Sequence, residues 1–214
     1  MPTREPMPRH VVRTGSATLS VTLVALVATL AVALVTVLGG WAPATPAGPT
    51  TRSAGTEIEA APFRVRLDRA EAAYRVGDRD ADEGRAFLVV DARVEVAHDE
   101  TATSTTLSRL VTADLDHAYD VYGGETADPA PEVRVAADDT SLLGIGPGLA
   151  YDVRLVFVVD ETDVPSRLAL VVSEHARRRS AIDRTPGWFD PAPVARVVLD
   201  VAPLPATRPE PEGL

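Results

Sequence analysis

Residues 18–38, which begin at Thr18 and end at Leu38, carry no charge, and this stretch constrains the chain most. A helix rises about 1.5 Å per residue, so a helix of this length covers roughly 30 Å, the thickness of a bilayer's hydrocarbon core. Because backbone polar groups in lipid must be paired within the segment, a single span has to be helical. The sequence therefore predicts a transmembrane helix within residues 16–40.

Charges beside this stretch predict its orientation. Arg4, Arg9 and Arg13 precede it with only Glu5 opposing them, whereas residues 39–51 on the far side contain no cation. Cations gather on the cytoplasmic side of single spans. We therefore expect residues 1–15 to be a cytoplasmic arm and the remainder to lie outside a plasma membrane.

A cleaved signal peptide is the alternative for the same stretch. Ala42, Pro43 and Ala44 resemble a small-x-small cleavage site, which would release a secreted protein. The apolar region of a signal peptide is about 7–15 residues long, and this run is longer. An uncleaved signal anchor is therefore favoured, and both interpretations export the rest of the chain.

Composition excludes several classes of chemistry. The chain contains no cysteine, which excludes disulfides, thiolate metal sites, cysteine nucleophiles and a lipid-modified cysteine anchor. Three of the 21 cations and one of the 31 acidic residues precede Gly39, so the following part carries 18 cations, 30 acids and a net charge of −12. Such a charge repels nucleic acid and anionic lipid, so no nucleic-acid partner is expected.

The exported part divides into three segments. Residues 41–56 are rich in Pro, Ala, Thr and Gly and predict an extended linker. Residues 57–202 contain runs in which apolar and polar residues alternate, as they do in strands with one buried face. The clearest runs are 63–67, 88–96, 151–159, 168–172 and 195–201. Residues 203–214 predict a disordered tail.

Glycine and proline turns separate these runs, and no long stretch shows a helical apolar period. An all-β, immunoglobulin-like antiparallel sandwich of seven or eight strands is therefore predicted for residues 57–202, because each sheet must cover its apolar face. This segment is longer than a minimal domain of that type. We place the surplus in long loops near residues 123–131 and 176–192.

The strand sequences resemble a known family. Residues 84–96 (GRAFLVVDARVEV) are followed by a polar Thr/Ser stretch, then by the Gly146-Pro147-Gly148 turn, then by residues 151–159 (YDVRLVFVV) and 168–172 (LALVV). This order resembles the telokin-like immunoglobulin-fold extracellular domains of Gram-positive lipoproteins and secreted antigens, over residues 60–173. The resemblance implies the fold and an extracytoplasmic location. It implies no catalytic residues, and without a cysteine the anchor has to be the helix.

No catalytic, cofactor or metal site is predicted. No nucleophile elbow, zinc-binding helix or phosphate loop is present. His98 with Asp99 and Glu100 favours a solvated hairpin loop, because neighbours in a strand point to opposite faces. Residues 78–83 resemble a calcium loop, but the glycine and the final glutamate are missing at the spacings that such a loop requires. Asp114, Asp116 and His117 supply too few oxygens for a hard cation.

Two surface features are candidate binding residues. Arg177, Arg178 and Arg179 form the one dense cationic run of the acidic domain, which indicates either a solvated loop or a site for an anionic envelope polymer. Trp188 and Phe189 lie between Pro-Gly and Asp-Pro turns. They predict either an exposed recognition tip or an apolar plug at the end of the sandwich.

The sequence therefore predicts a membrane-anchored, extracytoplasmic, non-catalytic binding or scaffold domain of the cell envelope. One alternative is an accessory subunit of a transporter or secretion complex, recruited through the span to another membrane protein. A second is an envelope hydrolase with an unrecognised site. The expected partners are the lipid bilayer, through residues 18–38, and either another membrane protein or an anionic envelope polymer.

Overall fold

The computed structural model describes Thr29 and residues 48–120, 122–126 and 129–208. The predicted cytoplasmic arm and transmembrane helix lie outside these residues, apart from Thr29. Within the described part of the chain, no helix is both long and apolar enough to cross a bilayer. The folded unit begins at Gly48.

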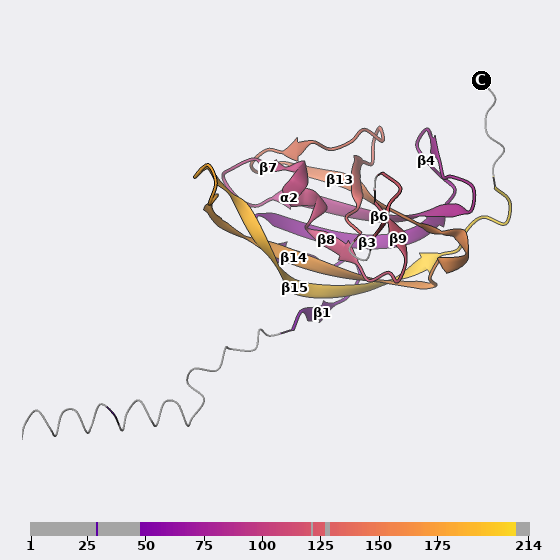
Figure 1. The fold of residues 1–214 in the computed structure, drawn as a ribbon, viewed down its shortest axis with the longest axis horizontal. Helices are drawn as coiled ribbons and strands as arrows, with labels where there is room; N and C mark the ends of the chain where they lie inside the picture. The colour runs from indigo at the N-terminus through magenta and orange to yellow at the C-terminus, as the bar shows by residue number, and fades with distance from the viewer. Residues whose placement is uncertain (1–28, 30–47, 121, 127–128, 209–214) are drawn as a thin grey trace, which may run out of the picture. The chain divides into compact units, whose positions relative to one another are not determined.

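Strands account for most of this unit, and its helices are short (Figure 1). The elements are β1 (Thr50–Arg52), β2 (Glu57–Ala60), β3 (Phe63–Ala73), β4 (Arg75–Val76), β5 (Arg79–Asp80), β6 (Arg85–Val96), β7 (Ala102–Thr103), α2 (Ser104–Ser108), β8 (Val111–Ala113), β9 (Ala118–Tyr119), β10 (Glu125–Thr126), β11 (Glu132–Val135), β12 (Gly144–Ile145), β13 (Ala150–Asp160), the 3₁₀ turn η1 (Glu161–Asp163), β14 (Arg167–Arg179) and β15 (Pro186–Ala202).

Two layers of sheet face each other across a shared core. The β6 layer consists of β10, β9, β13, β6 and β3, with β11 beside β13 and β2 beside β3. The β15 layer consists of β15, β14 and β8, with β1 beside β15. A short parallel pairing joins the layers where Val201 and Ala202 of β15 meet Ala70 and Glu71 of β3. The domain is therefore a β-sandwich whose two layers are joined at one edge.

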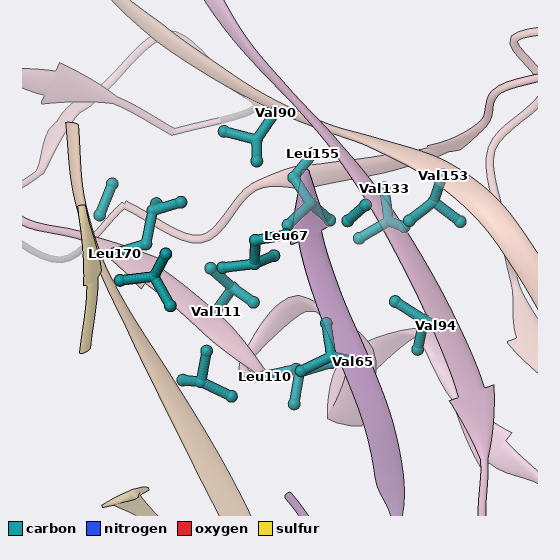
Figure 2. Close-up of a cluster of buried hydrophobic side chains, with 14 of the residues drawn as sticks. Val65, Leu67, Val90, Val94, Leu110, Val111, Val133, Val153, Leu155 and Leu170 are labelled. Atoms are coloured by element: carbon teal, nitrogen blue, oxygen red, sulfur yellow. The ribbon is translucent and has the colours of Figure 1, made fainter. Parts of the chain in front are cut away.

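Alternation along the long strands builds the core between the layers. Val153, Leu155 and Phe157 of β13 lie opposite Ala92, Val90 and Leu88 of β6, and all six are buried. The β15 layer contributes its own alternating set, Leu168, Leu170, Val172, Ala195, Val197 and Leu199. Figure 2 shows Leu170 and Val111 of the β15 layer near Leu67 of β3. The core face predicted for Phe157 is confirmed.

The other face of the β6 layer is also covered in part. Phe87 and Val89 of β6 and Val156 of β13 point away from the main core. They pack with Val76 of β4 and with Ala81, which follows β5, as a second buried cluster. This second cluster was not predicted. It means that the middle of β6 is buried on both sides.

The two-layer β architecture was predicted correctly, whereas its details were not. The described residues contain fifteen strands rather than seven or eight, most of the additional ones being two to four residues long. The sandwich is also not strictly antiparallel, because β15 pairs in parallel with both β1 and β3. The polar Thr/Ser stretch after residues 84–96 forms the short helix α2, and β8 follows it.

Three boundary predictions are corrected by contacts of the chain. The linker predicted for residues 41–56 contains β1, which pairs with Ala195–Val197 of β15. The loop predicted for residues 176–192 is instead the paired end of β14 and β15. Within the tail predicted for residues 203–214, Leu204 packs against the core, and Arg208 donates to the carbonyls of Asp82 and of Arg85, the first residue of β6.

Candidate functional site

The distal end of the β14–β15 hairpin, residues 176–192, is called the arm. Arg177 pairs with Trp188 across the two strands, Arg178 with Gly187 and Arg179 with Pro186. The arginine run is therefore part of a strand, and alternate arginines point to opposite faces of the arm. Its three positive charges do not form one continuous surface.

Carboxylates already neutralise two of these arginines. Arg177 forms a salt bridge with Glu100, in which its Nε lies 3.0 Å from Oε2. Arg178 donates to Asp190 at 2.9 Å, and this hydrogen bond holds the pKa of the Asp190 carboxyl below its usual value. Arg179 lies 3.4 Å from the carbonyl oxygen of Arg184. An anionic polymer would have to compete with Glu100 and Asp190, so its binding here stays a prediction.

The two aromatic residues of the arm are half-buried and lie on opposite faces of β15. Trp188 meets His98 edge to face, with 5.0 Å between ring centres. Phe189 lies beneath the guanidinium of Arg178, 4.5 Å from its ring centre. Trp188 is thus engaged by a residue outside the arm and Phe189 by one within it, whereas the turn at the end of the arm exposes Ile182 almost completely. Recognition by Trp188 and Phe189 stays a prediction.

A different site lies on the outer face of the β6 layer, where a cavity of about 250 Å³ opens. We call it the outer-face cavity. Its apolar lining comes from β6 and β13, which present Phe87, Val156 and Val158 on the face away from the main core. Its polar lining includes Arg79 of β5, Arg85 at the start of β6, and Tyr119 of β9. Three segments far apart in sequence therefore build one concave surface.

Cation–π contacts position both arginines of the outer-face cavity. Arg79 lies over Phe87 at 4.7 Å, and Arg85 lies over Tyr119 at 3.8 Å. The Tyr119 hydroxyl donates to Asp160 at 2.9 Å, and this hydrogen bond raises the pKa of Tyr119. Asp160 fixes the tyrosine through its hydroxyl, and the ring face holds the Arg85 guanidinium at the cavity wall.

The histidines and carboxylates considered as metal ligands form hydrogen bonds or ion pairs with neighbouring side chains. His117 Nδ1 lies 2.9 Å from Glu125, which raises the pKa of His117, and Arg196 binds Asp114 at 2.7 Å. His98 Nδ1 lies 2.6 Å from Asp99. Across residues 48–208, with the undescribed positions set aside, no three His, Asp or Glu side chains are grouped as metal ligands.

Sequence reasoning missed the outer-face cavity, and no local signal marked it. Arg79 lies in the charged segment 78–83, Arg85 near the start of the strand sequence 84–96, and Tyr119 outside the clearest alternating runs. Their meeting depends on β9 pairing with β13 at Tyr119 and Val158. Only the register of the β6 layer brings these residues together.

Comparisons with known proteins give distant structural likenesses. No family model matches the chain, and no curated protein matches it significantly. An uncharacterized β-sandwich protein from Clostridium difficile 630 is similar at 14% identity and a TM-score of 0.45, over 74% of this chain and 98% of that one. A candidate lipoprotein from Bacillus subtilis is 14% identical with a TM-score of 0.38, over 69% of this chain and 39% of that one.

A conserved hypothetical protein from Bacillus anthracis is similar at 12% identity and a TM-score of 0.34, over 64% of this chain and 94% of that one. The β-sandwich assignment rests on the two layers and shared core of this chain.

Proposed function

We infer that this protein is a non-catalytic binding domain held outside the cell on an N-terminal membrane anchor. The observation that carries this proposal is the uncharged stretch of residues 18–38, preceded by three arginines and followed by an acidic β-sandwich. A basic flank on one side and a cation-free flank on the other favour export of the sandwich. The anchor itself lies outside the described residues.

The binding role draws support from the surface of the domain. The outer-face cavity combines an apolar floor with arginine side chains, as small-molecule sites commonly do. The histidines at positions 98 and 117 are paired with carboxylates, and His175 is buried away from the surface. This distribution favours recognition of a ligand over acid–base catalysis.

We further assign the sandwich to the immunoglobulin-like class and to the telokin-like family it resembles. The Gly146–Gly148 turn, in which Leu149 donates to the Gly146 carbonyl, leads into β13, which carries the buried Phe157. The next strand, β14, buries Leu168 and Leu170. The features that carried the resemblance thus occupy structural positions of the core, which supports the assignment.

A topology reporter tests the proposal. An enzyme active only in the cytoplasm, fused after Leu214, should be silent, whereas the same enzyme fused after Arg13 should be active. An active C-terminal fusion would reverse the orientation and overturn the proposal. An epitope placed before Arg4 distinguishes the anchor from a signal peptide, since it stays on the full-length protein only if no cleavage occurs.

A further inference from the structure

Arg85 has hydrogen-bonding capacity that its neighbours do not use. Its side chain is about one quarter exposed and lies over Tyr119, at the wall of the outer-face cavity. A guanidinium carries five N–H donors. Within the described part of the chain, its only ion-pair partner is Asp82, and that contact is long, at 3.5 Å. Most of the donors on Arg85 are therefore available to a ligand.

Arg79 and three of the four carboxylates of this cavity, Asp80, Asp120 and Glu132, are already engaged. Glu132 accepts from Arg79 at 2.6 Å and from Arg134 at 3.0 Å. Asp80 accepts from Arg75 at 2.6 Å, and this hydrogen bond lowers the pKa of Asp80.

Asp120 accepts from the backbone N–H groups of Tyr122 and Gly124, each at 2.8 Å. These carboxylates therefore offer little attraction to a cation. Asp82 is 80% exposed and shares only the 3.5 Å contact with Arg85, so among the described residues Arg85 is the cation of the cavity that lacks a close partner.

The apolar floor limits which anions suit the site. Phe87, Val156 and Val158 present carbon surface beside Arg85, so a ligand gains from an apolar body as well as from a charge. The planar guanidinium matches a carboxylate, which it can bind through two parallel hydrogen bonds. The acidic surroundings disfavour a dianion such as phosphate, because a second negative charge would face Asp82 and Asp120.

We propose that the outer-face cavity binds a small organic acid, with its carboxylate on Arg85 and its apolar body over Phe87, Val156 and Val158. The volume of about 250 Å³ equals roughly eight water molecules at about 30 Å³ each, which suits a ligand of the size of benzoate. The inference rests on the proposed binding function and names the ligand class of that site.

The test is a titration of the full chain, reconstituted in lipid nanodiscs, with benzoate as the probe. Saturation-transfer difference NMR reports binding through the benzoate ring protons and tolerates weak affinity. We expect a saturable signal that benzyl alcohol, which lacks the charge, and acetate, which lacks the ring, reproduce only at about tenfold higher concentration. Inorganic phosphate should not displace benzoate at equal concentration.

Arg85→Gln should weaken benzoate binding about tenfold, because it removes the charged hydrogen bonds. Arg85→Lys keeps the charge without the planar fork, and should weaken binding by a smaller factor while retaining the fold. Arg196→Gln is the control, since Arg196 is a partly exposed arginine on the β15 layer that does not line the cavity. Its benzoate affinity should equal that of the natural chain.

Several results would overturn the proposal: no benzoate signal, equal affinity in the chain carrying Arg85→Lys, or displacement by phosphate at equal concentration. If Arg85→Gln fails to fold, the Arg85→Lys variant alone tests the proposal.

The topology reporter is independent of this titration. An active C-terminal fusion would reject the exported location, whereas a failed titration with a silent fusion would reject only the organic acid.

Discussion

The guanidinium of Arg208 donates a 2.7 Å hydrogen bond to the backbone carbonyl of Arg85, 123 positions earlier in the chain. The same Nη2 donates to the carbonyl of Asp82 at 2.9 Å, and the guanidinium lies 4.8 Å from the ring centre of Tyr74. The segment after β15 is thus attached to the turn before β6. That turn positions Arg85 at the wall of the outer-face cavity.

Replacing Arg208 with alanine should loosen this turn. Two hydrogen bonds from a charged donor are lost at a partly exposed site, so we expect a loss of about 1 kcal/mol in the free energy of unfolding. Amide hydrogen exchange at residues 82–85 should accelerate. Arg167→Ala is the control, because its 3.5 Å contact with Asp200 joins two exposed side chains. Unchanged exchange at residues 82–85 would show that Arg208 does not hold the turn.

Phe157→Ala should empty part of the main core. Phe157 is only 2% exposed and lies opposite Leu88 of β6. Truncation of a packed phenylalanine costs about 3–5 kcal/mol, which urea denaturation would measure. Tyr122→Ala is the matched control, since that side chain is 93% exposed and should change stability little. A loss below about 1 kcal/mol for Phe157→Ala would contradict the packing described for β13.

Gly187→Ala should disturb the arm. A Cβ atom at Gly187 would lie 2.9 Å from Cε2 of Phe189, so the phenylalanine ring would have to move away from Arg178. Because the ring is half-buried and can shift, we expect a loss of about 1 kcal/mol in the free energy of unfolding, the lower end of the cost of overpacking a core. At Gly48 an added Cβ meets nothing within 4 Å, so Gly48→Ala serves as the control. Equal stability of the two variants would mean that the ring does not pack on Gly187.

His175 should make the fold sensitive to mild acid. It is 4% exposed, neither ring nitrogen has a hydrogen-bond partner, and burial, helped by the charge of Arg109, lowers its pKa. The unfolded chain, with a histidine pKa of about 6.5, then binds more protons than the folded one. Stability should fall as the pH drops below about 6.5, by at most about 1.4 kcal/mol per pH unit, until the lowered pKa is passed.

His175→Leu should remove this contribution, as denaturation curves between pH 5 and pH 8 would show. His117 acts in the opposite sense, because Glu125 raises its pKa and stabilises the folded state at lower pH. His117→Gln should therefore steepen the loss of stability in acid. Parallel pH profiles for the natural chain and the His175→Leu variant would contradict the assignment of His175 as buried and neutral.

The core strands were predictable because their burial follows a strict period of two. Val153, Leu155, Phe157 and Val159 alternate with more exposed or outward-facing residues, and the structure buries all four in the main core. Residues 195–201 follow the same rule. A single-sided burial pattern specifies a strand and its core face without knowledge of its neighbours.

A β-bulge interrupts the two-residue period of burial, and the predicted strands end where such bulges occur. In β3, Phe63, Val65 and Leu67 are buried, and after a register shift the buried positions become Ala70 and Ala72. The added residue reverses the phase of the alternation. A similar shift in β14 turns His175 inward. The alternation of apolar and polar residues therefore does not continue beyond the shift, and the extension of β14 into the arm was not predicted.

The outer-face cavity and the short strands depended on long-range pairing. Tyr119 reaches Arg85 only because β9 pairs with β13 beside β6. The pairing of β1 with β15 joins residues more than a hundred positions apart. Neither relationship leaves a local pattern in composition or period, since both are fixed by tertiary packing.

The position of β1 has a mechanical consequence. Tension transmitted along the chain from its N-terminal side reaches the folded unit first at Thr50–Arg52, and these residues hold to β15 through only three residue pairs. The next attachment is the 2.7 Å hydrogen bond from Gly55 to the Leu67 carbonyl. Detachment of β1 would free residues 48–54 and lengthen the tether by roughly 20 Å while the core stays intact. The three pairs of β1 are therefore the first contacts of the folded unit that a pull on the N-terminal side of the chain would break.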